Sequence, residues 1–308
     1  KILNWYDINK RSLPWRKRFS LKKKQYYTLV SEFMLQQTQV TTVIPYFNRF
    51  IKNIPDLETL ANFDEQKLIK FWEGLGYYSR VRNLKKTAQV IVKDFNKKLP
   101  SNFLELKSLP GIGDYTASAI SAIAFNKPLI PLDGNVERVL KRYLYLKKKN
   151  LIQKENLIKQ KKIFGTSRRS SDYAQALMEL GTLICKPNNP LCAKCPISRK
   201  CTSFIKKDFT LTKITKKNKD KYFLLKVYKK NNKYLLVKND KFKFLKNLNI
   251  FPMTELIKPK NFKQNMNFKM SNMNMSVKIE NNKIIKAIPF SYWIDPKNLK
   301  NYTLPTFT

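Results

Sequence analysis

The sequence predicts a mainly α-helical protein that ends in a small α+β domain. Apolar residues recur at helical spacing through most of residues 1–205, and proline or glycine separates the periodic segments. After Cys201 the helical spacing gives way to short alternating segments. The segments with helical spacing are Tyr27–Gln39, Phe63–Trp72, Ser79–Phe95, Phe103–Ser108, Asp114–Phe125, Asn135–Tyr145 and Ser171–Ile184.

The connections between these helices are predicted from helix-breaking residues. They are Pro45, Pro55, Gly74, Gly76, Pro100, Pro110, Gly111, Gly113, Pro128 and Pro131. A lysine-rich stretch over 147–162 is typical of a solvated helix or loop.

The chain is predicted to divide into a helical domain over 1–205, a charged linker over 206–221 and a second domain over 222–308. The linker is inferred because 206–221 lacks glycine and is rich in lysine. The second domain is inferred from alternating segments, which predict strands at Tyr222–Tyr228, Tyr234–Val237, Met273–Ile279 and Ile284–Ile288.

The charge of the chain favours a polyanionic partner, nucleic acid first. Lys and Arg number 62 against 21 Asp and Glu, a net charge of +41. Codon bias explains part of this excess, because Lys, Asn, Ile, Phe and Tyr are all abundant.

The sequence also excludes some classes of function. No long apolar run is present, so we expect no membrane span. The absence of histidine excludes His-dependent catalysis and His-ligated metals, which leaves Asp, Glu, Lys, Tyr or Cys for acid–base chemistry.

The four cysteines predict a metal centre. Cys185, Cys192, Cys195 and Cys201 follow the spacing C-x6-C-x2-C-x5-C. Four thiolates in so short a segment can enclose one compact centre, and the single CxxC favours a 4Fe–4S cluster over zinc. Structural zinc stays open as an alternative, while disulfides are disfavoured because the rest of the chain is typical of an intracellular protein.

A hairpin between two predicted helices is typical of a phosphate-binding turn. Leu109-Pro110-Gly111-Ile112-Gly113 permits a tight turn, and its glycines expose backbone N–H groups at the start of the next helix. An ordinary turn between helices is the alternative. Asp133 follows the second helix, where it could cap the next helix and also stabilise positive charge on a sugar.

The hairpin, the Leu132-Asp133-Gly134-Asn135-Val136 segment and the cysteine spacing together resemble the helix-hairpin-helix glycosylase superfamily. Within it, residues 1–205 are similar to the MutY-type adenine DNA glycosylases. The further matching motifs are Leu13-Pro14-Trp15-Arg16, Ser31-Glu32-Phe33-Met34-Leu35-Gln36-Gln37-Thr38-Gln39-Val40 and Gly74-Leu75-Gly76-Tyr77-Tyr78-Ser79-Arg80. The resemblance implies a two-lobed core with a 4Fe–4S loop, followed by a small Nudix-like domain.

The resemblance also implies roles for individual residues. Glu32 would be the acid that protonates the leaving base, and Asp133 would stabilise the cationic sugar or act as a transient nucleophile. Related endonuclease III-type enzymes carry a lysine where this chain has Tyr115. Since tyrosine cannot form an imine, we expect base removal without strand cleavage. The remaining implied residues are Asn135 (catalytic), Leu13, Trp15, Arg16 and Gln175 (adenine pocket), and Gln36, Gln37, Tyr78, Leu109, Gly111 and Gly113 (DNA binding).

The C-terminal domain resembles the family's Nudix-like reader of 8-oxoguanine in a degenerate form. Met270-Ser271-Asn272 stands where the family has a Phe-Ser-His recognition turn, so only Ser271 is retained. No Nudix catalytic box is present, which argues against nucleotide hydrolysis. Intact lesion reading and a decayed domain that only clamps DNA stay open as alternatives.

The expected protein is a monomeric bacterial enzyme of the cytoplasm, associated with the nucleoid. Its expected partner is double-stranded DNA that contains A:8-oxoguanine or A:G mispairs, from which it removes adenine. Two alternatives remain: an endonuclease III-like glycosylase/lyase that acts on oxidised pyrimidines, and a non-catalytic DNA-binding protein with a structural metal.

Overall fold

The computed structural model describes residues 1–146, 167–210, 218–242, 244–257, 262–270, 273–282, 288–302 and 304. The chain divides into two compact units. Unit 1 comprises Lys1–Glu65 and Ser79–Lys213, and unit 2 comprises Gln66–Tyr78 and Ile214–Thr308. The predicted lysine-rich stretch at 147–162 lies outside the described residues.

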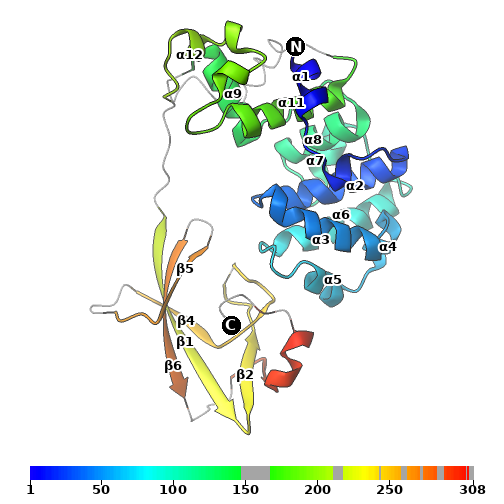
Figure 1. Cartoon of the computed structure of the whole chain (residues 1–308). Helices are drawn as coiled ribbons and strands as arrows, with labels where there is room; N and C mark the ends of the chain where they lie inside the picture. Colours follow the sequence, from blue (N-terminus) through cyan, green and yellow to red (C-terminus); the bar gives the residue numbers. More distant parts are fainter. Residues whose placement is uncertain are drawn as a thin grey trace. The chain divides into compact units, whose positions relative to one another are not determined.

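Helices make up unit 1 almost entirely (Figure 1). Two of them, α7 (Phe103–Ser108) and α8 (Asp114–Phe125), have the bounds predicted from the sequence. The other helices of the described residues are α1 (Ile2–Asn9), α2 (Leu21–Leu35), α3 (Val40–Asn53), α4 (Leu57–Asn62), α5 (Glu65–Phe71, whose last six residues group with unit 2), α6 (Ser79–Asp94), α9 (Gly134–Leu144), α11 (Ser170–Glu179) and α12 (Thr202–Ile205). A π-helical turn, Leu180–Ile184, continues α11, and short 3-10 turns lie at Pro14–Arg16, Cys192–Lys194 and Ser198–Lys200.

Helix α3 corrects one prediction, because Pro45 lies inside it and not in a connection. Proline removes one backbone donor from the helix interior and normally ends the helix. Here the apolar face formed by Val43, Phe47 and Phe50, spaced four and three residues apart, is buried. Burial of these side chains outweighs the lost hydrogen bond.

The central helix α8 is built from small residues, which lets its neighbours approach closely. Its buried side chains include Ala117, Ala119 and Ala122, and it packs against α2, α7 and α11. Helix α2 carries Glu32 and helix α11 carries Gln175, so α8 determines how these two predicted site residues are spaced.

Helix α6 holds the predicted phosphate-binding hairpin from one side. The hydroxyl of Thr87 donates to the carbonyl of Pro110 at 2.8 Å. Gly111 has a φ of +76°, and a Cβ added there would meet the side chain of Asn83 at 2.7 Å. Glycine is therefore required at position 111 for two reasons, the positive φ and the close approach of α6.

Unit 2 consists mainly of a β-sheet. Its strands are β1 (Lys219–Lys230), β2 (Lys233–Lys238), β3 (Asn249–Ile250), β4 (Met253–Leu256), β5 (Met266–Met270), β6 (Met273–Asn282) and β7 (Ser291–Ile294). The order is β3-β2-β1-β6-β5, with β4 on β1 and β7 on β2. A 3-10 helix, Pro296–Asn301, follows.

The two long strands β1 and β6 run parallel over their whole paired length, from Lys219 opposite Met273 to Tyr228 opposite Asn282. Their inward residues Phe223, Leu225 and Val277 form the centre of the apolar core of this unit. Strand β1 begins at Lys219, inside the stretch predicted as a linker. The predicted strand Ile284–Ile288 falls almost wholly outside the described residues, and Ile288 is not in a strand.

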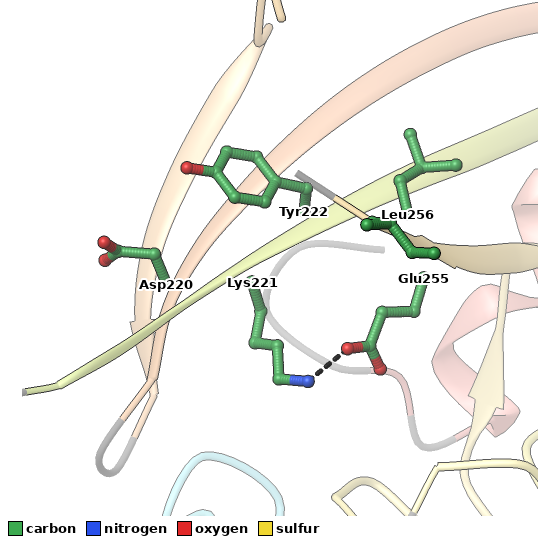
Figure 2. Close-up of a pocket in the computed structure, with 6 residues that line it drawn as sticks. Asp220, Lys221, Tyr222, Glu255 and Leu256 are labelled. Carbon is green, nitrogen blue, oxygen red and sulfur yellow. Dashed lines mark hydrogen bonds and ion pairs between the residues drawn. The ribbon is translucent and has the colours of Figure 1, made fainter. Parts of the chain in front are cut away.

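A surface hollow in unit 2 lies between β1 and β4 and contains none of the predicted site residues (Figure 2). The side chains of Lys221 and Glu255 point toward one another there and form an ion pair. Both side chains are more than one third exposed, so this pair contributes little to stability. Within the described part of the chain, no helix is long and apolar enough to cross a membrane.

The hairpin gives a matched pair of glycine variants. Gly111→Ala should lower the free energy of unfolding by about 1–3 kcal/mol, because alanine disfavours positive φ and its methyl group would press on Asn83. Gly113→Ala is the control, since its φ is −92° and a Cβ there meets nothing within 4 Å. Urea unfolding of both free proteins measures the difference, and equal losses would contradict the tight packing of Gly111 against α6.

Candidate active site and cysteine pocket

One cavity in unit 1 gathers every predicted catalytic and adenine-pocket residue. It has a volume of about 180 Å³. The predicted residues that line it are Glu32, Tyr115, Asp133, Asn135, Leu13, Trp15, Arg16 and Gln175. They come from segments as far apart in the sequence as Leu13 and Gln175, so the fold brings together what spacing alone could not.

Glu32 is a buried acid on the apolar part of α2. It is 5% exposed, and the residues that follow it on the helix, Phe33 and Met34, are also buried. Burial raises its pKa to about 7, the negative charge of Asp133 adds to the increase, and a hydrogen bond from Tyr115 opposes it. The Oε2 atom has no hydrogen-bond partner within the described part of the chain. The carboxyl group can therefore carry a proton at neutral pH and still has an oxygen available for a bound molecule.

Asp133 is held as the N-cap of α9. Its Oδ1 accepts a hydrogen bond from the backbone N–H of Val136 at 2.7 Å, and its Oδ2 accepts one from Asn135 Nδ2 at 2.9 Å. An N-cap carboxylate also gains from the positive end of the helix dipole. Capping and a role in the cavity are thus compatible, as the sequence predicted.

A chain of hydrogen bonds continues from Asp133 toward the first cysteine. Arg138 Nη2 donates to Asn135 Oδ1 at 2.8 Å and to the carbonyl of Gly181 at 2.7 Å. Its Nε donates to the carbonyl of Cys185 at 2.7 Å. A Cβ at Gly181 would lie 2.7 Å from Asn135 Cβ and 3.0 Å from its carbonyl carbon and oxygen. Helix α9 and the π-helical turn can approach this closely only because residue 181 is glycine.

Trp15 and Gln175 form further walls of the cavity. The ring of Trp15 packs edge-on against Phe47, with centroids 5.1 Å apart. Gln175 Nε2 donates back to the carbonyl of Ser171 at 3.2 Å. The walls are thus fixed by contacts within the protein, which leaves a shaped space that combines apolar surface with a few polar groups.

Two functional candidates at this cavity were missed by sequence reasoning. Arg11 lines it, and Glu179, the last residue of α11, binds both Arg11 and Arg16. A signal was present, because Glu179 is an acid flanked by apolar residues in the Ala174–Ile184 segment. Its partners, however, lie more than 160 positions away, which spacing does not reveal.

The four cysteines line a second cavity of the same unit. Apolar side chains contribute to its wall, namely Val139, Leu180, Ile184, Ile197, Phe204 and Phe209. Burial raises the pKa of the Cys195 thiol to about 11 and also raises the pKa values of Cys192 and Cys201. Buried thiols resist ionisation unless a positive centre compensates them, so this donor set fits a metal centre.

A buried arginine also faces the cysteine pocket. Arg142 is 3% exposed; its Nη1 lies 3.6 Å from Cys185 Sγ and its Nη2 donates to the carbonyl of Pro187 at 2.8 Å. Its positive charge favours thiolates and would balance an anionic centre. Among the residues that the structure describes, no three His, Cys, Asp or Glu side chains converge tightly around a single point that could hold one metal ion.

Known proteins match this arrangement closely. Residues 30–162 match the model of the HhH-GPD superfamily of base excision DNA repair proteins. An adenine DNA glycosylase of Buchnera aphidicola subsp. Baizongia pistaciae is 40% identical over 240 residues, which cover 76% of this chain and 67% of the relative. A second, from Buchnera aphidicola subsp. Schizaphis graminum, is 38% identical over 259 residues, which cover 82% of this chain and 73% of the relative. The chain belongs to the adenine DNA glycosylase family.

Similar proteins are also found outside these bacteria. The Homo sapiens adenine DNA glycosylase is 40% identical over 211 residues, which cover 65% of this chain and 38% of that protein. Among solved structures, a thermostable thymine-DNA glycosylase superposes with a TM-score of 0.61 at 27% identity, covering 67% of this chain and 94% of its own. The fold class predicted from the sequence, a helical helix-hairpin-helix core followed by a small strand-containing unit, is confirmed.

The residues predicted to contact DNA differ in their exposure to solvent. Gln37 is exposed and has a φ of +59°, whereas Leu109 and Tyr78 are buried. Gln36 Nε2 donates to Thr116 Oγ1 at 3.3 Å and to the carbonyl of Gly111 at 3.4 Å. Gln36 therefore links the end of α2 to the hairpin.

The predicted lesion-recognition residues belong to unit 2. Met270 is the last residue of β5, and Ser271 and Asn272 lie outside the described residues. Their role therefore stays a prediction.

Burial of Glu32 has a measurable cost in stability. Its pKa is higher in the folded protein than the ordinary value of 4.5, so folding favours the protonated form. Stability should fall as pH rises from 4.5 to about 7, by about 3 kcal/mol in total, because the unfolded chain then ionises more readily. Glu32→Gln removes this titration. Between pH 4 and pH 8, the free energy of unfolding of the variant should therefore rise relative to that of the native protein by about 3 kcal/mol.

Urea unfolding of the two proteins across this pH range checks the prediction. Glu105→Gln, which removes an exposed glutamate of α7, controls for the change in net charge. Parallel stability curves for the native protein and Glu32→Gln would contradict the buried, protonated state.

Proposed function

We propose that this protein removes adenine from mispairs with 8-oxoguanine or guanine in double-stranded DNA by hydrolysis of the N-glycosidic bond, as a step of base excision repair. The observation that carries the proposal is the shared cavity, in which a buried acid with a pKa of about 7 and a capped carboxylate line one space. The family membership agrees with it.

Glu32 acts as the general acid. Its proton passes to a ring nitrogen of adenine while the bond from C1′ of the sugar to N9 breaks, and the bonding electron pair leaves with the base. Tyr115 donates a hydrogen bond to Glu32 and so orients the carboxyl group. Water then adds to C1′ and returns a proton to the Glu32 carboxylate, which restores the enzyme.

Asp133 stabilises the positive charge that develops on the sugar. Its two hydrogen bonds, from Val136 and Asn135, hold the carboxylate in place before the charge appears. Tyr115 replaces the lysine that would attack the sugar as an amine, so the product is an abasic site in an unbroken strand. The base must leave the helical stack to reach the cavity. Gln37, which is exposed, is proposed to fill the gap that the base leaves.

The decisive test is base release from duplexes with adenine opposite 8-oxoguanine, G, C or T. We expect release in the first two and an intact strand until alkali is added. Asp133→Asn should lower the single-turnover rate at least about hundredfold while duplex affinity changes little, since the lost group acts on charge in the transition state. No release from any duplex would leave a DNA-binding protein only, and release of oxidised pyrimidines with strand cleavage would indicate the lyase alternative.

We further propose that Cys185, Cys192, Cys195 and Cys201 hold a 4Fe–4S cluster. When bound, such a cluster is an electron-transfer centre that also ties the loop together. The exposed lysines and arginine of the surrounding loop, Lys186, Lys194, Arg199 and Lys200, are then displayed toward a phosphate backbone.

The cluster has a visible signature. Protein purified without oxygen should be brown and contain about four irons and four sulfides per chain. Cys195→Ala should lose the colour, whereas Ser198→Ala in the same pocket should keep it. A colourless protein that contains about one zinc would show that the alternative centre is correct.

The C-terminal unit, as a degenerate Nudix-like domain, is proposed to sense the base opposite the adenine. Ser271 is the residue that carries this proposal. Ser271→Ala should reduce the ratio of adenine release opposite 8-oxoguanine to release opposite guanine, because a polar contact to the lesion is lost. The same assay with Ser276→Ala, on the neighbouring strand β6, is the control; an unchanged ratio for Ser271→Ala would mean that the unit only clamps DNA.

A further inference from the structure

Glu179 stands out among the acids because it is completely buried and yet charged. Its side chain is 0% exposed. Burial opposes its ionisation, but hydrogen bonds and charges from Arg11 and Arg16 outweigh burial and lower its pKa. A buried carboxylate of this kind needs both partners, and both partners line the catalytic cavity.

The contacts of Glu179 fix two guanidinium groups side by side. Arg11 binds it in a fork, with Nε to Oε2 at 2.8 Å and Nη2 to Oε1 at 2.9 Å. Arg16 Nη1 donates to the same Oε1 at 2.7 Å. One oxygen thus joins two positive groups that would otherwise repel one another.

Arg16 is engaged through only one end of its guanidinium in these contacts. Its Nε is buried and has no hydrogen-bond partner in the described part of the chain. The Arg16 side chain is 15% exposed, so this donor has little access to solvent. A donor of this kind in the cavity wall suits an acceptor atom on the bound base.

We propose that Glu179 is a positioning residue, which acts through Arg11 and Arg16 to set the shape and the charge of the cavity wall that faces the base. The effect of Glu179 on the rate of adenine release rests on the proposed function, whereas its effect on the pKa of Glu32 does not. Glu179 itself touches neither the base nor the sugar.

The consequence for Glu32 follows from charge. The groups that act on Glu32 are Tyr115, Asp133 and Arg16, and the positive charge of Arg16 favours the ionised form. Glu179 shares that positive charge and holds the guanidinium in place, with Tyr6 and Arg11 as its other neighbours. Without Glu179, the charge of Arg16 is no longer balanced, and Glu32 loses its proton more easily.

The test compares Glu179→Gln with Asp172→Asn, which removes an acid from the same helix α11 but one paired with Arg169 instead. The pKa of Glu32 is measured in the free proteins by 13C NMR of labelled glutamate, and the single-turnover rate of adenine release is measured against pH. In Glu179→Gln we expect a lower pKa of Glu32 and an alkaline limb of the rate profile displaced to lower pH. If the pKa of Glu32 falls by one unit, the rate at pH 8 should fall about tenfold, because about one tenth as much of the acid is protonated there. Well below the pKa, this change of protonation should not lower the rate.

Further variants separate position from folding. Glu179→Asp keeps the charge and should fall between the native protein and Glu179→Gln. Arg16→Gln should move the pKa of Glu32 in the opposite direction, because it removes the cation. If Glu179→Gln does not fold, the pKa of Glu32 in Glu179→Asp decides the matter, and an unchanged value there overturns the proposal.

The outcomes are distinct. An unchanged pKa of Glu32 in Glu179→Gln, or equal shifts in Glu179→Gln and Asp172→Asn, overturns the proposal, as does a uniform loss of rate at every pH. If the native protein releases no adenine, the proposed function fails, and the NMR titration still decides the role of Glu179.

Discussion

The close approach of α9 to the π-helical turn after α11 is the constraint on which the site depends. Gly181 removes the Cβ that would collide with Asn135, and Arg138 then spans the junction with hydrogen bonds to Asn135, Gly181 and Cys185. The carboxylate of Asp133 is oriented by Asn135 at one end of this junction, and the cysteine pocket begins at the other. A π-helical turn inserts an extra residue into a helix, a feature often found at functional sites. The cavity and the cysteine pocket therefore share one structural support.

The second requirement of the site is that an acid stays protonated near neutral pH in a chain without histidine. Burial of Glu32 provides this, because desolvation penalises the carboxylate more than the carboxylic acid. The same burial destabilises the folded protein at high pH, so the proposed function and stability oppose one another at this residue.

Local features of the fold could be predicted from the sequence where local rules decide them. Helices α7 and α8 have strong apolar periodicity, and the Pro-Gly hairpin between them has its own signature, so their bounds were predicted correctly. Helix α3 was missed because Pro45 is a local signal against a helix, whereas burial of Phe47 and Phe50 is a tertiary effect. The predicted catalytic and adenine-pocket residues do line one cavity. Glu179 was not found, because its role depends on Arg11 and Arg16, which lie far from it in the sequence.

Tyr115 is the residue on which the proposed choice between base removal and strand cleavage depends. It lies in the first turn of α8, directly after the hairpin. A phenol placed there cannot form an imine, and here its hydroxyl hydrogen-bonds to Glu32 instead. Burial, together with the nearby negative charges of Glu32 and Asp133, raises the pKa of Tyr115 well above its usual value, so the phenol stays a neutral donor. Under the proposed function, the position that would supply a nucleophile for strand cleavage instead orients the acid for base removal.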